Sequence, residues 1–329
     1  HRLDNHLTGP GTTTISELGY IILDMRRFFP ILAAAVVLVF AGCSNENGEL
    51  IAFMSDRDGD YEIFVMDADG TNVRQLTDDP DRSIERLTVT HQTKPVPEKF
   101  NHDYDGDPAW SPDGNRIAFQ SDRDGDHEIF VMDDDGTHVQ QLTDSDNRNG
   151  NPAWSPDGNR IAFQSSRDGD HDIFVMDADG THLQQLTDSD HYDGNPAWSP
   201  DGNRIAFQSD RDGVWEIFVM DADGTNLQQL TDNDDWDQFP AWSPDGTRIA
   251  FQSDRDGDAE IFVMDADGTN VQQLTDNDSY DENPAWSPDG NRIVFVSDRE
   301  QKPKEFFVMD ADGTNVVTIN QRGLSPVWR

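Results

Sequence analysis

The feature that most constrains the fold of this chain is a strict internal repeat. The segment "PAWSPDG" or its close variant recurs with its tryptophan every 44 residues, at Trp110, Trp154, Trp198, Trp242 and Trp286. Within each repeat, short apolar runs such as "IAFQS" and "EIFVM" alternate with turn sequences such as "PDGN", "DRDGD" and "DADG". Asp-Gly between apolar runs is typical of tight hairpins, because glycine adopts a positive φ without steric cost. Four strands per repeat at this period predict an all-β propeller built of four-stranded antiparallel blades.

The two halves of the repeat differ in number, and this difference predicts how the ring closes. The half that reads "IAF" or "IVF" begins six times, whereas "PAW" occurs five times and a related "PVW" ends the chain at Trp328. The first repeat, from Glu49 onward, therefore lacks its innermost strand. We expect the C-terminal strand to complete blade 1, which closes a six-bladed ring and leaves no strand edge free. The repeated tryptophans and the methionines of "EIFVM" should lie in the core.

The charge of the chain excludes one class of ligand. It has 24 Lys+Arg against 65 Asp+Glu, a formal net charge of −41. Nucleic acid and anionic lipid headgroups are repelled by so acidic a protein, because their recognition needs clustered basic residues. We therefore expect no nucleic-acid partner, and contact with a membrane only through a lipid anchor. The arginines that recur in every repeat should bind carboxylates between strands or blades.

The N-terminal region has the features of a lipid-anchored protein. Residues 1–24 precede a methionine and are interpreted as a non-native upstream segment. Residues 25–42 begin with Met-Arg-Arg, continue as a short apolar run and end in Ala-Gly. They resemble a bacterial lipoprotein signal peptide, and the resemblance implies cleavage before Cys43, lipidation of that cysteine and a place in the bacterial cell envelope, at the outer membrane. Residues 43–48 then form a tether, and residues 49–329 form the propeller.

The repeats "PAWSPDGNRIAFQSDRDG" and "EIFVMDADGTNVQQLT" resemble those of the TolB-type β-propeller family, relatives of WD-repeat propellers. The resemblance extends over residues 49–329. It implies a scaffold of the cell envelope whose partner is another envelope protein, although one fold hosts many activities. Only residues 44–48 separate Cys43 from the first blade. We therefore expect no α/β domain of the kind that precedes the propeller in the protein that gives the family its name.

The turns between the second and third strands carry carboxylates at alternate positions around a glycine, as in "DRDGD". Such spacing is typical of loops that bind hard cations, although in an EF-hand the glycine comes one position later and a bidentate glutamate follows. Two interpretations stand: solvated turns, or calcium sites with dissociation constants of about 10⁻⁴–10⁻³ M. The candidate ligands are Asp56, Asp58, Asp60, Asp122, Asp124, Asp126, Asp168, Asp170, Asp254, Asp256 and Asp258.

Function in a propeller is expected where the repeats differ from one another. An insertion at about 81–102 lengthens the first repeat from 44 to 66 residues, and the turn of blade 6 reads "DREQKPKEFF". Ring closure places these two segments in neighbouring blades, so that their lysines would form one basic island for a partner. These four lysines, the only ones in the chain, are Lys94, Lys99, Lys302 and Lys304.

Three further aromatic residues, Trp215, Trp236 and Phe239, also break the repeat. Exposed rings beside carboxylates suit glycan stacking or a protein hot spot, and rings that fill gaps at the blade rim are the alternative. The sequence contains no G-x-S-x-G and no H-E-x-x-H motif, so we expect a binding protein rather than an enzyme. It thus predicts a lipid-anchored scaffold for a protein partner. The alternative is a calcium-assisted propeller that binds or cleaves glycans.

Overall fold

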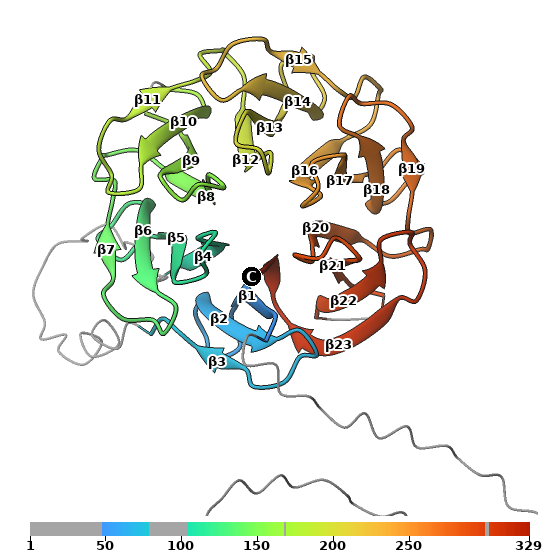
Figure 1. Cartoon of the computed structure of the whole chain (residues 1–329), viewed down its shortest axis with the longest axis horizontal. Coiled ribbons are helices and arrows are strands. Elements are labelled where there is room, and N and C mark those ends of the chain that lie inside the picture. Colours follow the sequence, from blue (N-terminus) through green and yellow to red (C-terminus); the bar gives the residue numbers. More distant parts are fainter. Residues whose placement is uncertain (1–47, 79–103, 168, 300–302) are drawn as a thin grey trace, which may run out of the picture. The chain divides into compact units, whose positions relative to one another are not determined.

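The computed structural model describes residues 48–78, 104–167, 169–299 and 303–329. Predictions that concern residues 1–47, the insertion at 81–102, Asp168 or Lys302 lie outside this part of the chain. The described residues belong to a compact unit, Asn45–Arg329, and form six four-stranded antiparallel sheets around a central axis (Figure 1). They include no helix long and apolar enough to cross a membrane. The predicted six-bladed propeller is confirmed.

Each blade contributes four strands, counted from the axis outward. The innermost strands are β24 (Leu324–Trp328), β4 (Asp105–Trp110), β8 (Asn149–Trp154), β12 (Asp193–Trp198), β16 (Asp237–Trp242) and β20 (Asp281–Trp286). The second strands are β1 (Leu50–Ser55), β5 (Arg116–Ser121), β9 (Arg160–Ser165), β13 (Arg204–Ser209), β17 (Arg248–Ser253) and β21 (Arg292–Ser297). The third strands are β2 (Glu62–Asp67), β6 (Glu128–Asp133), β10 (Asp172–Asp177), β14 (Glu216–Asp221), β18 (Glu260–Asp265) and β22 (Glu305–Asp310). The outermost strands are β3 (Arg74–Gln75), β7 (Gln140–Gln141), β11 (Gln184–Gln185), β15 (Gln228–Gln229), β19 (Gln272–Gln273) and β23 (Val317–Arg322).

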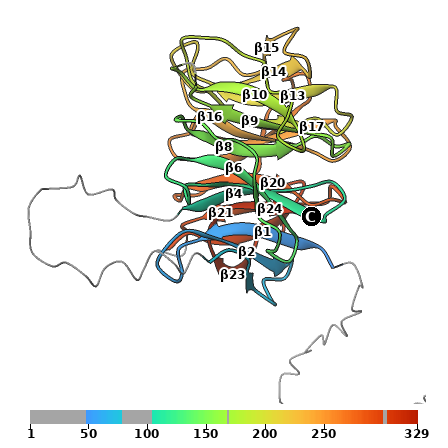
Figure 2. The same cartoon turned by 90° about the vertical axis from the view of Figure 1, so that its left-hand side faces the viewer.

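The last strand of the chain closes the ring. In blade 1 the strand order is β24-β1-β2-β3, so the C-terminal strand takes the innermost place (Figure 2). Trp328 lies opposite Ile51, and Val327 lies opposite Ala52. The N–H of Arg329 also donates to a carbonyl of β1, at 2.8 Å. The predicted closure is therefore confirmed, and β1 has no free inner edge.

The course of the chain gives the propeller two distinct faces. In blade 2, for example, the turns at 111–115 and 134–137 lie at one end of the strands. This end of each blade is called the turn face. The turn at 122–127 and the connection to the next blade at 144–148 lie at the opposite end, because successive strands are antiparallel. This second end is called the mouth face.

The apolar core lies between neighbouring blades. The third strand β6 is buried along five of its six residues, because both faces of its sheet pack against other blades. Trp154 of blade 3, for instance, packs with Ala118 and Ile129 of blade 2. The repeated tryptophans and the methionines from Met66 to Met309 are buried. Their predicted place in the core is confirmed.

One series of arginines covers the core tryptophans. The guanidinium of Arg116 in blade 2 lies 4.5 Å from the ring centre of Trp154 in blade 3, within cation–π range. The same contact recurs from each following blade to the next. Blade 1 has Leu50 at the position of Arg116, and Arg329 lies instead 5.2 Å from the ring centre of Trp110. The C-terminal residue thus completes this series, as the C-terminal strand completes the sheet.

Buried carboxyl groups lie at the junctions between blades. Where blades 4 and 5 meet, Glu216 and Asp237 are only 1% and 0% exposed. Arg255, from the turn between the second and third strands of blade 5, donates to both oxygens of Asp237, at 2.9 and 2.8 Å, as predicted for the repeated arginines. Asn233 joins the two acids, since its backbone N–H donates to Glu216 at 2.6 Å and its side chain donates to Asp237 at 2.8 Å. Burial raises the pKa of Glu216 to about 7, and the charge of Asp237 adds to the rise.

Candidate functional site

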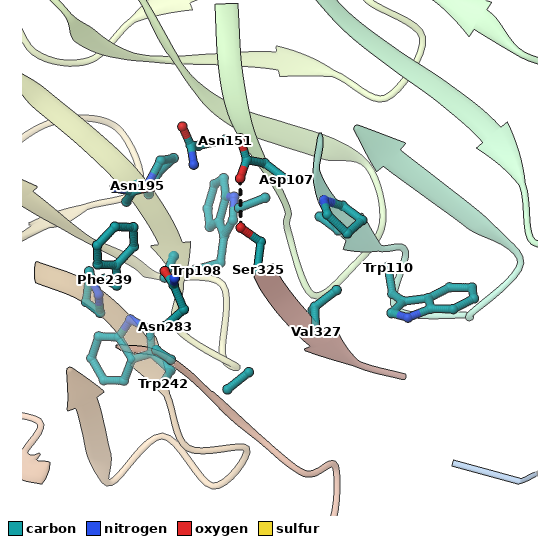
Figure 3. Close-up of a pocket in the computed structure, with 18 of the residues that line it drawn as sticks. Asp107, Trp110, Asn151, Asn195, Trp198, Phe239, Trp242, Asn283, Ser325 and Val327 are labelled. Carbon is teal, nitrogen blue, oxygen red and sulfur yellow. Dashed lines mark hydrogen bonds between the residues drawn. The ribbon is translucent and has the colours of Figure 1, made fainter. Parts of the chain in front are cut away.

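A cavity of about 400 Å³ lies along the axis of the propeller. The innermost strands of all six blades line it, and Figure 3 shows the lining side chains in close-up. Proline, alanine and tryptophan recur along these strands, whereas one lining position differs strongly between blades. The residues at this position, here called the bulge ring, are Asp107, Asn151, Asn195, Phe239, Asn283 and Ser325.

A β-bulge sets the backbone of the bulge ring. The pairing of β4 with β5 shifts register between Gly106 and Ala109, and Asp107 inside this bulge has a φ of 49°. All six residues of the ring have φ between 49° and 55°. This left-handed region suits Asn and Asp, whose short polar side chains tolerate it. A glutamine of the preceding blade supports the bulge: Gln164 Oε1 accepts the N–H of Asn195 at 3.2 Å.

Phe239 is the exception in the bulge ring. Its φ is 55°, a conformation that costs a bulky residue about 1–2 kcal/mol. Its N–H donates to Gln208 Oε1 at 3.0 Å, so the backbone is held as in other blades. Its half-buried ring lines the cavity between Asn195 and Asn283 (Figure 3). Other blades form the same bulge without a bulky side chain, so the bulge itself does not require the phenyl ring of Phe239.

Asp107 connects the cavity to the closing strand. Ser325 Oγ donates to Asp107 Oδ1 at 2.9 Å (Figure 3), and the Tyr104 hydroxyl donates to Asp107 Oδ2 at 3.3 Å. Burial raises the pKa of Asp107, and both hydrogen bonds act in the opposite direction. The cavity therefore contains one poorly solvated carboxyl group beside the neutral amides of the bulge ring.

A row of mostly aromatic side chains adjoins the bulge ring on the mouth face, from blade 1 to blade 4. Tyr104 lies between Tyr61 and His127, with ring centres at 5.7 and 5.5 Å. Farther along, Tyr192 and Trp215 meet edge to face at 5.0 Å. Each of these contacts joins a residue that precedes a third strand to a residue that precedes an innermost strand, and the contact of Tyr61 with Tyr104 crosses from one blade to the next. This row, here called the aromatic arc, consists of Tyr61, Tyr104, His127, Arg148, His171, Tyr192 and Trp215.

Hydrogen bonding fixes the state of one histidine in the arc. The side-chain oxygen of Gln120 lies against Gly150, at the bulge of the next blade, so its amide nitrogen faces His127 Nδ1, at 2.8 Å. His127 accepts this bond on Nδ1 and therefore carries its proton on Nε2. Burial lowers the pKa of His127 and of His171, and the positive charge of Arg148 lowers both further. Both rings are thus neutral at neutral pH.

Of the predicted partner-binding residues, Phe239 lines the cavity, and Trp215 belongs to the aromatic arc on the mouth face. Trp236 belongs to the same face, but its side chain is 54% exposed. Lys304 forms an ion pair with Glu282. Outside the described residues lie Lys94, Lys99 and Lys302. The basic island therefore stays a prediction.

Four of the aspartates predicted to bind calcium accept hydrogen bonds within the mouth face. Asp122 Oδ1 accepts the N–H of Tyr104 at 2.7 Å, and Asp254 accepts the equivalent bond in blade 5. Asp124 and Asp256 each accept a bond from a glutamine of the outermost strand. Among the described residues, no three His, Cys, Asp or Glu side chains are placed to hold a metal ion. Calcium binding stays a prediction.

Sequence analysis did not single out most of the aromatic arc. The missed residues share a signal, which is variation between repeats at two aligned positions. The residues before the third strands are Tyr61, His127, His171, Trp215, Ala259 and Lys304. The residues six positions before the core tryptophans of the innermost strands are Tyr104, Arg148, Tyr192, Trp236, Tyr280 and Arg322. Aligning the repeats on the third strands and on these tryptophans would have selected both columns.

Comparison with known proteins agrees with this architecture. A model of the family described as TolB beta propeller domain matches residues 144–239 and 236–328, more than half of the chain. A curated relative, the Protein TolB homolog of Chlorobium chlorochromatii (strain CaD3), is 36% identical over 146 residues, covering 37% of this chain and 32% of the relative. The match thus spans about a third of the relative's length.

Solved structures share the fold. TolB from Acinetobacter baumannii has a TM-score of 0.70 at 24% identity, with 85% of this chain and 66% of that chain covered. A chain of the Nidogen/Laminin complex has a TM-score of 0.66 at 11% identity, with 86% and 98% covered. At these identities both likenesses concern the fold alone. The family match, together with six blades that the C-terminal strand closes, shows that the chain belongs to the TolB β-propeller domain family.

Proposed function

We propose that this propeller is a scaffold that binds a protein partner at the mouth of its central channel. The observation that carries the proposal is the gathering of non-repeated aromatic residues at one end of the cavity. Phe239 lines the cavity, and Trp215 packs edge to face against Tyr192 of the aromatic arc. Other blades form the same bulge without a bulky side chain at a positive φ. Large aromatic side chains dominate the binding energy of protein interfaces, especially at the centre of a concave site. The match to a TolB homolog supports an envelope protein as the partner.

Lipid anchoring and an envelope location belong to the same proposal. They are supported by the signal-like residues 25–42 followed by Cys43, and by the family. The test is metabolic labelling with palmitate, compared between the wild type and a Cys43→Ala variant. The lipid anchor is supported if only the wild type is labelled and only the wild type is found in the membrane fraction. An unlabelled wild type would exclude the anchor.

The experiment for the scaffold compares three variants of matched kind. Envelope extract is passed over immobilised wild type, Trp215→Ala, Phe239→Asn and Trp236→Ala. We expect the first two variants to lose a captured protein that the wild type and Trp236→Ala retain, because the side chain of Trp236 is exposed to solvent, whereas Trp215 packs against Tyr192. Deletion of residues 81–102 tests in parallel whether the insertion contributes to capture. Capture that is unchanged in Trp215→Ala and Phe239→Asn would exclude the mouth as the binding site.

A second candidate is calcium-assisted binding of glycans. It is favoured by Trp236 and Tyr280, which are 54% and 53% exposed at equivalent positions of neighbouring blades. Exposed ring faces suit stacking on sugars. A glycan array probed with and without calcium tests this function. Binding that is lost in Trp236→Ala and Tyr280→Ala but kept in Trp215→Ala would favour it over the scaffold.

A further inference from the structure

Arg148 differs from the arginines that recur in the repeats. It stands where Tyr104 and Tyr192 stand in neighbouring blades, and it is exposed. Ser166 holds its backbone from both sides, with hydrogen bonds of 3.1 and 3.0 Å. Among the described residues, its guanidinium has no carboxylate within ion-pair distance. In a chain with a net charge of −41, such an arginine has its donors available for a ligand.

Arg148 directly precedes β8 and stands three residues before Asn151, which lines the cavity. The pKa of His127 and that of His171 are lowered first by burial, and the charge of Arg148 adds to the lowering at both. The pKa of Tyr192 is raised mainly by burial, and the same charge opposes that rise. The positive charge of Arg148 therefore acts on groups of blades 2 and 3 and of the connection to blade 4.

Neutral donors accompany this charge. His127 carries its proton on Nε2, because Gln120 donates to its Nδ1. The amide side chains of Asn151 and Asn195 line the adjacent part of the cavity (Figure 3). A guanidinium with neutral N–H donors nearby is suited to a carboxylate, which accepts several charge-assisted hydrogen bonds at once.

The acidic mouth face restricts which anion can reach Arg148. A phosphate or a polyuronate carries several negative charges and is repelled by a protein of net charge −41. A single carboxylate is repelled least, and basic groups next to it would be attracted by exposed turn residues such as Asp124, Asp126 and Asp170. The C-terminus of a polypeptide with lysine or arginine a few positions upstream combines both features. A chain end also enters a cavity of about 400 Å³ without the bend that an internal segment needs.

We propose that the mouth, on the side of blades 2 to 4, binds the free C-terminal carboxylate of a partner polypeptide through Arg148. Basic residues upstream of that terminus face the acidic turns, and its last apolar side chain contacts Phe239. This inference rests on the proposed scaffold function and adds the chemistry of the end that is recognised.

The test uses a synthetic pentapeptide of two lysines, serine, glycine and a final phenylalanine. It is made once with a free C-terminal carboxylate and once as the amide, and both are titrated calorimetrically into the full-length protein. We expect the free acid to bind about 10- to 100-fold more tightly than the amide, the usual effect of a charge-assisted hydrogen bond.

Two substitutions taken from the chain's own repeats provide the matched comparison. Arg148→Tyr introduces the residue found at Tyr104, and Arg74→Gln introduces the residue found at the equivalent Gln140. Each removes one exposed positive charge, but Arg74 lies on the outermost strand of blade 1. We expect Arg148→Tyr to abolish the preference for the free acid and Arg74→Gln to leave it unchanged.

Three outcomes overturn the proposal: equal affinity for acid and amide, a preference that survives Arg148→Tyr, or no binding of either peptide tighter than about 1 mM. Trigalacturonate serves as a third ligand. If it bound more tightly than the free-acid peptide and this binding depended on Arg148, the ligand of the site would be an acidic glycan and not a polypeptide. If both peptides fail while Trp215→Ala still abolishes capture of a protein partner, only the carboxylate inference is lost. If that capture is also insensitive to Trp215→Ala, the scaffold function is lost as well.

Discussion

The turn face and the mouth face are built from the same six repeats, yet they differ in how strictly the repeats agree. On the turn face, Ser155 and the N–H of Asn159 both donate to one oxygen of Asp157, at 2.6 and 3.1 Å. Equivalent networks recur in blades 2, 4, 5 and 6. These bonds, that of Ser155 first, lower the pKa of Asp157 to about 2. On the mouth face, by contrast, aligned positions hold residues as unlike as Tyr104 and Arg148.

This difference distinguishes positions that the fold constrains from positions that it leaves free to vary. Positions that form turns or fill the space between blades meet the same surroundings six times, so one residue type suits them all. Positions at the channel mouth face solvent or the cavity, where the fold places few requirements on the side chain. Unlike residues at aligned positions of the mouth face therefore indicate where the molecule recognises a partner. Substitutions at the two kinds of position test this difference.

The largest expected effect comes from substituting two tryptophans that belong to the two kinds of position. Trp328 is 6% exposed and packs with Ile51 and Val294 where the ring closes, whereas Trp236 is 54% exposed. We expect Trp328→Ala to lower the free energy of unfolding by about 3–5 kcal/mol. Trp236→Ala should change it by less than about 0.5 kcal/mol. Urea denaturation followed by circular dichroism measures both changes. If Trp328→Ala lowered the free energy of unfolding as little as Trp236→Ala, the packing of Trp328 would contribute little to stability.

The next effect is a dependence of stability on pH that arises at the blade junctions. Burial raises the pKa of Glu216 to about 7 and that of Glu260 to about 8, from an ordinary value of 4.5. Between 4.5 and these values the folded protein binds more protons than the unfolded chain, so the free energy of unfolding falls as pH rises through this window. Over the upper part of this window, from about pH 6.5 to about pH 8, we expect a loss of roughly 1–2 kcal/mol per junction. Denaturant titrations across this range measure it.

One junction supplies the control for this prediction. Where blades 2 and 3 meet, Asn149 stands in place of the aspartate, and its amide donates to Glu128 at 2.6 Å. Asp281→Asn copies this arrangement beside Glu260 and removes the neighbouring negative charge. The variant should show a shallower decline above pH 7 than the wild type. His127 and His171 do not interfere, because their lowered pKa values act below pH 6.5. An unaltered slope would assign the pH dependence to other groups.

A smaller effect of opposite sign is expected in the bulge ring. Phe239→Asn gives blade 5 the residue that three other blades have at a φ near 55°. Relief of backbone strain should raise the free energy of unfolding by about 1 kcal/mol, while binding at the mouth weakens. The reciprocal Asn195→Phe should lower stability by a similar amount. Thermal unfolding of both variants measures the pair, and a destabilised Phe239→Asn would mean that the ring packs for stability instead.

The sequence predicted the blades and their closure because those features depend on periodicity, which one chain displays in full. It also located Trp215 and Phe239 as departures from the repeat. It did not reveal that Phe239 would line the cavity and that Trp215 would pack against Tyr192, while Trp236, three residues before Phe239, stays exposed. That outcome depends on the β-bulge, which changes the strand's alternation, and on contacts such as Tyr192 with Trp215 across a blade boundary. Contacts between side chains of neighbouring blades cannot be predicted from the repeat period alone.

The smallest expected effect concerns calcium, and two turns of the mouth face make it testable. In blade 5 the pKa of Asp258 is raised, first by desolvation and then by the charges of Asp256 and Asp278. Blade 4 has Val214 at the same position. A cation would offset this repulsion, and at a calcium concentration equal to a dissociation constant near 1 mM one site adds about 0.4 kcal/mol.

We therefore expect a small rise in melting temperature with calcium, compared with magnesium at the same ionic strength, that Asp258→Val diminishes. Because the stabilisation would come from one more carboxylate on an already acidic turn, Val214→Asp should increase it. A melting temperature that calcium leaves unchanged in all three proteins would mean that the aspartates of these turns serve the hydrogen bonds of the mouth face alone.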